Sequence, residues 1–237
     1  MEKVLLHTPE GVRDVYGKEC AVKLTIENSI NKVFNIYGYH NIQTPTFEFF
    51  DIFSKERGSV ASKNLYKFFD REGNTLVLRP DVTPSIARLV AKYYMDVKVP
   101  VKLCYNANTY INNSELQGKL KENTQLGCEL INDDSVEADA EILALVVDSL
   151  KAAGLKEFLV EIGHADFYKG LLEECGFDTE NEQELRKRIE NKNYFGVEEI
   201  LDNNNITGQL KEAFLKLPEL FGSIDVIKSA KELTDNK

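Results

Sequence analysis

The chain has 237 residues, of which 43% are hydrophobic and 29% charged, with 10 Tyr and 13 Phe. This composition supplies a large core, excludes a disordered or low-complexity chain, and allows one large domain or two small ones. The formal net charge of −10 and the pI near 5.0 argue against broad electrostatic binding of nucleic acid, because an acidic surface repels phosphate backbones.

The four cysteines lie far apart in the sequence and include no Cys-x-x-Cys pair: Cys20, Cys104, Cys128 and Cys175. Neither a disulfide framework nor a zinc site is therefore expected, and the three scattered histidines suggest no metal site either. The N-terminus lacks the charged start and apolar stretch of a signal peptide, and no apolar window approaches the roughly 18 residues of a membrane span. We expect a reduced, cytoplasmic protein that does not contact membranes.

The first three quarters of the chain alternate between helical and strand-like patterns. Apolar residues at helical intervals predict a helix over residues 20–37, and Gly38 is expected to end it. Short alternating or apolar runs predict strands over residues 40–44, 65–70, 75–79, 101–107, 123–131 and 158–162. The second and third of these strands flank a Glu-Gly-Asn turn at residues 72–74 and are expected to form a hairpin.

Two further helices are expected before the C-terminal part. Thr83 is predicted to cap a helix over residues 83–94, with Pro84 in its first turn. The run Asp-Ser-Val-Glu at residues 134–137 predicts a capping box that opens a helix ending near residue 153. Short helices are predicted near residues 182–190, 196–202, 209–215 and 224–233. The fold class is therefore α+β, with a mostly antiparallel sheet flanked by helices over residues 1–176 and a helical segment over 177–237.

The strand at residues 123–131 carries the most informative polar pattern. Apolar and polar side chains alternate along it: Leu126, Cys128 and Leu130 on one face, Gln125, Gly127 and Glu129 on the other. A half-buried carboxylate needs a cation or hydrogen-bond donors, so a ligand ammonium would pair with Glu129 while Gln125 orients it. The alternative is an ordinary exposed polar face of an antiparallel sheet, which the spacing alone favours.

A second candidate pair, Asp81 and Thr83, lies where a strand turns into a helix. Taken alone, Asp81 is better explained as a turn residue and Thr83 as a helix cap than as ligand-binding groups. For Arg79 the sequence favours neither of two roles, a structural ion-pair partner or a ligand-binding group.

Three segments in combination resemble class II aminoacyl-tRNA synthetases. Residues 38–48 (GYHNIQTPTFE) resemble motif 1, residues 78–83 (LRPDVT) the Leu-Arg-Pro-Glu-Gly-Thr segment of histidyl-tRNA synthetases, and residues 124–129 (TQLGCE) the second strand of motif 2. Their order and spacing match from about residue 8 to residue 165. The resemblance implies a class II synthetase-like core in which four residues bind the α-amino group of a histidine-like amino acid: Asp81, Thr83, Gln125 and Glu129.

One departure from that family bears on catalysis. Synthetases carry an arginine, in a Phe-Arg-x-Glu sequence, that grips the ATP α-phosphate and the amino acid carboxylate. Residues 110–113 are YINN, so Ile111 takes the place of the arginine and Asn113 that of the glutamate. Losing one preorganised donor typically costs about 10²–10³ in rate, and neither Lys119 nor Lys121 offers the planar fork of arginine. We therefore expect no catalytic residue, no cofactor and no adenylate formation.

The chain also ends before motif 3, the histidine-specific arginine-tyrosine segment and an anticodon-binding domain, as a fragment of a longer protein would. A synthetase-like chain with a retained amino acid site and a lost ATP site resembles the family of ATP phosphoribosyltransferase regulatory subunits. The resemblance implies a non-catalytic chain that joins the catalytic subunit in a hetero-oligomer and supports activity and histidine feedback control of the first step of histidine biosynthesis. It further implies a homodimer through motif 1, and no nucleic acid or membrane partner.

The dimer surface has a sequence candidate in one apolar run: Phe47, Phe49, Phe50, Ile52 and Phe53. An ordinary core explains this run equally well. Two other functions stay open. In the first, the chain is a fragment of an active histidyl-tRNA synthetase. In the second, it is an interaction module that binds no ligand.

Overall fold

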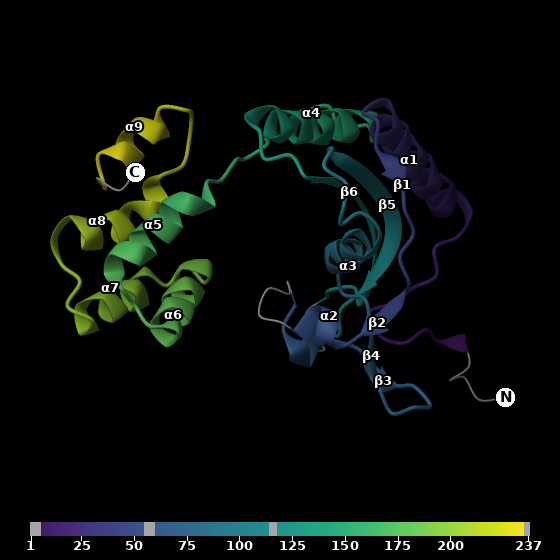
Figure 1. Ribbon diagram of the computed structural model, residues 1–237, viewed down its shortest axis with the longest axis horizontal. Helices are drawn as coiled ribbons and strands as arrows, with labels where there is room; N and C mark the ends of the chain where they lie inside the picture. Colours follow the sequence, from purple (N-terminus) through teal and green to yellow (C-terminus); the bar gives the residue numbers. More distant parts are fainter. Residues whose placement is uncertain (1–5, 55–59, 114–117, 235–237) are drawn as a thin grey trace. The chain divides into compact units, whose positions relative to one another are not determined.

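The computed structural model describes residues 6–54, 60–113 and 118–234. The chain divides after Leu159 into two compact units, residues 1–159 and 160–237. The first unit holds all the strands among the described residues, and the second is helical (Figure 1).

The main sheet of the first unit has the strand order β1-β5-β6. Its strands are β1 (His40–Asn41), β5 (Val101–Tyr110) and β6 (Glu122–Ile131). β1 runs parallel to β5, while β5 and β6 are antiparallel over their full length, from Val101 opposite Ile131 to Tyr110 opposite Glu122. Figure 1 shows these two long strands as a curved ribbon. The predicted strand near residue 40 is present but shorter, because the chain leaves β5 after its second residue.

A smaller antiparallel sheet has the strand order β2-β4-β3. Its strands are β2 (Phe47–Phe49), β3 (Lys67–Phe69) and β4 (Thr75–Leu78), with the short α2 (Asp51–Ser54) and a 3-10 turn, η2 (Ser62–Asn64), between β2 and β3. β3 and β4 form the predicted hairpin. Gly73 has φ 85°, a left-handed conformation that glycine adopts without steric cost.

Helices cover both faces of the main sheet. α1 (Gly17–Ile36) and α4 (Val136–Ala152) pack together on one face, and α3 (Thr83–Tyr93) lies on the other (Figure 1). The core on the α1–α4 side centres on four buried residues: Phe34, Tyr39, Cys104 and Leu145. The core on the α3 side centres on five: Val82, Ile86, Val101, Leu103 and Tyr105. The α+β class and the helix-flanked sheet are confirmed.

The predicted end of α1 holds, and the predicted start of α4 is refined by one residue. α1 ends before Gly38, whose φ of 82° suits a residue after a helix. α4 is capped by Ser135, whose Oγ accepts a hydrogen bond from the backbone N–H of Ala138 at 3.2 Å. The cap is therefore Ser135, one residue later than the Asp134 of the predicted capping box. Ala138, at the third helical position, has no polar side chain that could bond back to the cap residue, so the capping box is incomplete.

The predicted strand over residues 158–162 is wrong. The structure has no strand there, and the side chains of Leu159 and Ile162 are 76% and 73% exposed. An alternating pattern becomes a strand only where another strand offers its backbone groups. No described strand pairs with these residues.

The second unit is a cluster of helices: α5 (Ala165–Cys175), α6 (Thr179–Glu190), α7 (Tyr194–Asn203), α8 (Gly208–Lys216), η3 (Leu217–Glu219) and α9 (Val226–Lys231). The four short helices expected from the sequence correspond to α6, α7, α8 and α9. Their core includes fully buried Leu185, Leu201 and Phe214. Leu171 of α5 is buried in the same core, so this unit begins before residue 177, where the composition changes. Among the described residues, no helix is long and apolar enough to cross a bilayer.

Candidate functional site

The pairing of β5 with β6 sets the two faces of the strand that carries Glu129. Leu126, Cys128 and Leu130 pack against the core under α1 and α4, as alternation predicts. The opposite face, which carries Gln125, Gly127 and Glu129, turns toward α3.

Thr83 and Glu129 are joined by a hydrogen bond. The Thr83 Oγ1 hydroxyl donates to Glu129 Oε1 at 2.7 Å, linking the first residue of α3 to β6. The prediction that Thr83 caps α3 is wrong, because the cap position is Val82 and the helix has no side-chain cap.

Asp81 belongs to the same group of side chains. Its Oδ1 accepts a hydrogen bond from the backbone N–H of Val82 at 2.7 Å, which fixes the turn before α3. Its charge raises the pKa of both Glu129 and Tyr105. Asp81 therefore both stabilises the turn before α3 and acts electrostatically on Glu129.

Tyr105 is the residue of this group that the sequence did not single out. It lies on β5 directly opposite Gly127, and its Oη accepts a hydrogen bond from Gln125 Nε2 at 3.1 Å. A Cβ atom at Gly127 would lie 2.4 Å from Tyr105 Oη, so the glycine makes room for this ring and not for a ligand. A glycine flanked by polar residues on a strand is a signal of close approach, but it does not say which group approaches.

We call Asp81, Thr83, Tyr105, Gln125 and Glu129 the Glu129 cluster. Burial is the largest cause that raises the pKa of Glu129; the Thr83 hydrogen bond lowers it and the charge of Asp81 raises it. Burial, followed by the charges of Glu129 and Asp81, raises the pKa of Tyr105 to about 12. Within the described part of the chain, no Lys, Arg or His nitrogen lies within 4.0 Å of a Glu129 oxygen.

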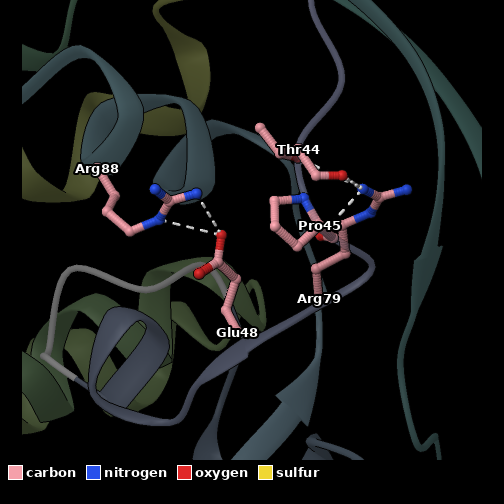
Figure 2. A network of polar contacts seen from close by, with 5 residues as sticks. All are labelled: Thr44, Pro45, Glu48, Arg79 and Arg88. Atoms are coloured by element: carbon pink, nitrogen blue, oxygen red, sulfur yellow. Dashed lines mark hydrogen bonds and ion pairs between the residues drawn. The ribbon is translucent and has the colours of Figure 1, made fainter. Parts of the chain in front are cut away.

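Arg79 has a structural role, and its partners are carbonyl groups. Its Nη1 donates to the carbonyl oxygens of Thr44 and Pro45 at 2.8 and 3.2 Å, and its Nε donates to that of Asn108 at 2.8 Å. Figure 2 shows the guanidinium beside the Thr44–Pro45 segment, apart from the ion pair between Glu48 and Arg88. Arg79 therefore joins residues 44–45 to β5.

Ile111 follows the last residue of β5. Its backbone N–H donates to the Lys121 carbonyl at 2.9 Å, which extends the pairing of β5 and β6 by one position. Alternation then places its side chain on the face of Tyr105 and Glu129. The Lys121 stem packs against Gly11, where an added Cβ atom would lie 2.6 Å from Lys121 Cγ, and Lys119 is exposed.

A family model described as histidyl-tRNA synthetase matches residues 11–237. The chain is 46% identical over 236 residues to a protein of Ruminiclostridium cellulolyticum named ATP phosphoribosyltransferase regulatory subunit, a match that covers 100% of this chain and 56% of the relative. It is 42% identical over 232 residues to a protein of the same name from Acetivibrio thermocellus, covering 98% of this chain and 56% of the relative.

A solved structure gives the same picture. The crystal structure of an ATP phosphoribosyltransferase regulatory subunit/histidyl-tRNA synthetase from Bacillus halodurans is similar with a TM-score of 0.87 at 36% identity, covering 98% of this chain and 60% of the other. The chain thus spans 56–60% of the length of these relatives.

Proposed function

The chain belongs to the histidyl-tRNA synthetase family, and we propose that within it the chain is part of a regulatory subunit of ATP phosphoribosyltransferase. In this role it supports the activity of a catalytic subunit and brings histidine feedback control to the first step of histidine biosynthesis. The names of its curated relatives support this choice over an aminoacylating enzyme.

The observation that carries the proposal is the state of Glu129. It is a half-buried carboxylate beside a second acid, Asp81, and no basic side chain in the described ranges lies within ion-pair distance. A half-buried carboxylate without a basic partner is disfavoured in its charged form, and a cation that neutralises it removes that cost. The α-ammonium of a histidine-like amino acid supplies that cation, with Gln125 and Thr83 as neighbouring polar groups.

In this proposal the chain does not form an adenylate, because residue 111 is isoleucine and not arginine. The isoleucine side chain lies on the face of the Glu129 cluster and can neither neutralise a phosphate nor donate a hydrogen bond. An amino acid would therefore bind here without being activated by ATP. The bound amino acid then acts as an effector, which shifts the catalytic subunit only if it binds the active and inactive assemblies with different affinities.

The direct test measures phosphoribosyl transfer by the catalytic subunit with and without the full-length protein, over a range of histidine concentrations. Wild type is expected to raise the basal rate and to confer histidine inhibition. E129Q is expected to raise the basal rate equally while the inhibition shifts to higher histidine concentrations. The exposed E137Q serves as the control. No effect of the wild-type chain on rate or inhibition would overturn the proposal.

The second candidate is an aminoacylating histidyl-tRNA synthetase, which the description of the matching family favours. Histidine-dependent exchange between ATP and pyrophosphate by the full-length protein distinguishes the two. The regulatory function predicts no exchange above background, and robust exchange would establish the synthetase.

We further propose that the chain forms a homodimer through the smaller sheet. The apolar run at residues 47–53 splits in the structure: Phe53 is buried and Phe50 and Ile52 pack beside it, whereas Phe47 and Phe49 are 52% and 56% exposed. Pairing within the sheet puts Phe68 on the same face, with its ring 5.8 Å from that of Phe47. An exposed aromatic face of this kind is typical of a protein interface.

The setting of the proposed function is the cytoplasm, without a nucleic acid partner. All four cysteines are free, as is usual in a reducing compartment. The net charge of −10 disfavours binding to tRNA and is compatible with a protein partner.

A further inference from the structure

A cavity of about 410 Å³ lies at the edge of β5, between α1 and residues 42–46. Its volume falls in the range of small-molecule sites. Tyr105 contributes to its wall, but the other four members of the Glu129 cluster do not line it. We call it the β5-edge cavity. The cavity and the Glu129 cluster therefore share Tyr105 and differ in their other residues.

The wall of this cavity is an unpaired stretch of strand. The Cys104 carbonyl accepts from the N–H of Ile42, and the Asn108 carbonyl accepts from Arg79 Nε, so the even-numbered residues of β5 direct their backbone groups to this edge. Beyond Ile42 the neighbouring segment leaves the strand. The N–H groups of Asn106 and Asn108 consequently face the cavity, with no backbone acceptor in the described ranges.

Arg79 adds a cationic donor to the same space. Its residue is only 6% exposed, and its Nε and Nη1 are held by carbonyl groups. Its Nη2 makes no hydrogen bond within residues 6–54, 60–113 and 118–234, and Figure 2 shows one nitrogen pointing away from Thr44 and Pro45. No carboxylate of these residues lies within ion-pair distance of it. The Arg79 residue is thus nearly buried, and among the described residues one of its guanidinium nitrogens makes no hydrogen bond and no carboxylate lies within ion-pair distance; the more distant charge of Glu48 acts on it.

The other charged side chains of the lining pair with each other. Lys23 and Glu27 of α1 both line the cavity, and Lys23 Nζ is 3.4 Å from Glu27 Oε1. Glu27 Oε2 accepts from the Asn106 side chain at 2.8 Å. Within the described residues, Glu27 is therefore paired with Lys23, although its buried Oε1 accepts no hydrogen bond, and Arg79 is the lining cation that has no carboxylate within ion-pair distance. Burial lowers the pKa of Arg79, a cost that a bound anion would offset.

We propose that the β5-edge cavity binds a small oxyanion, the carboxylate or phosphate group of a metabolite. The anion accepts hydrogen bonds from Arg79 Nη2 and from the backbone N–H groups of Asn106 and Asn108. Lys23, which is paired with Glu27, also lines the cavity. Backbone N–H groups combined with a guanidinium are a recurrent means of holding carboxylate and phosphate.

The test titrates the full-length protein with inorganic phosphate and, in a separate arm, with acetate, at constant ionic strength against chloride. Binding is measured by calorimetry and by the rise in unfolding temperature. Saturable binding of phosphate alone identifies a phosphate ligand, binding of acetate alone a carboxylate ligand, and binding of both the shared chemistry. Absence of saturable binding in both arms overturns the proposal.

Two variants locate the bound anion. R79K keeps the charge but loses the planar fork, and K23Q removes the charge that balances Glu27 at a half-exposed position of α1. Each is expected to weaken binding about tenfold, the effect of one charge-assisted hydrogen bond or ion pair. K32Q, an exposed change on the same helix, should bind as wild type. If R79K does not fold, K23Q decides alone. If K23Q and K32Q bind the anion with equal affinity, the anion lies elsewhere and the proposal is overturned.

Discussion

The Thr83 hydroxyl donates to Glu129 Oε1 at 2.7 Å, across 46 positions of the sequence. This contact ties the start of α3 to β6. The N-cap position of α3 is Val82, and the helix has no side-chain cap. A threonine before proline at a helix start usually serves the helix. Here Thr83 makes no cap, and its hydroxyl donates to a half-buried acid on β6, which indicates a polar site beside this turn.

The first prediction concerns histidine affinity. E129Q keeps the size and acceptor of the side chain but removes its charge, so the ammonium of histidine loses its counter-ion. We expect affinity to fall at least tenfold, about 1.4 kcal/mol, by calorimetry on the full-length protein. E137Q, on the exposed first turn of α4, should bind as wild type. Equal affinities for E129Q and E137Q would show that Glu129 does not contact the ligand.

The second prediction separates the hydroxyl of Thr83 from its shape. T83V removes the donor to Glu129, and T83S retains it. Because a hydrogen bond to a charged group contributes about 1.5–3 kcal/mol, T83V should weaken histidine binding about tenfold while T83S stays close to wild type. Circular dichroism should show unchanged helix content in both, since Thr83 does not cap α3. A loss of helix in T83V alone would assign the residue to folding.

The third prediction concerns stability against pH. The pKa of Glu129 is raised, so the folded protein holds this proton more tightly than the unfolded chain does. Stability then falls as pH rises from the ordinary carboxyl value through the raised folded value, and ionised Glu129 is unfavourable at neutral pH. Without ligand, E129Q should unfold at a higher temperature than wild type at pH 7. The difference should shrink below pH of about 4, where both side chains are neutral.

The fourth prediction tests the packing of Tyr105 on Gly127. A Cβ atom at position 127 would lie 2.4 and 2.5 Å from Oη and Cζ of Tyr105. G127A is expected to destabilise the protein by about 1–3 kcal/mol, the usual cost of overpacking. In a Y105A background the same change should cost much less, which urea denaturation of the four proteins of the cycle measures. Additive effects would mean that the ring moves aside freely.

The fifth prediction concerns the homodimer. F47E together with F49E places charges on the exposed face of the smaller sheet and should shift the protein toward monomer in sedimentation equilibrium. F69E is the matched control, since Phe69 is 73% exposed and its side chain lies on the opposite face of β3 from Phe68. Dissociation by F69E alone would move the interface to that other face.

Local patterns in the sequence predicted most elements of this fold. Alternation over residues 123–131 predicted which side chains of β6 meet the helices, and Gly38 and Gly73 predicted a helix end and a turn. These features depend on neighbours a few residues away. The strand expected at residues 158–162 failed because a strand also needs a partner, which alternation cannot supply.

For the site, the sequence predicted Asp81, Thr83, Gln125 and Glu129 as a group only through resemblance, and it missed Tyr105. The ring is buried beside apolar residues of β5 and looks like any core aromatic. Its place in the Glu129 cluster depends on its register opposite Gly127 and on the hydrogen bond from Gln125. The sequence likewise did not distinguish a structural from a ligand-binding role for Arg79. Its hydrogen bonds to three carbonyl groups are seen only in the tertiary structure.

By itself, the sequence determined the α+β class, the faces of β6, the free state expected for the cysteines and the family to which the chain belongs. Only the tertiary structure decided that Thr83 bonds to Glu129, that a tyrosine fills the space above Gly127, and that Arg79 presents an unpaired nitrogen to a cavity. Periodicity reports which side of an element is apolar, because burial acts on every residue of that side. The partner of a single polar side chain depends on where distant segments meet, and that is fixed only when the chain packs.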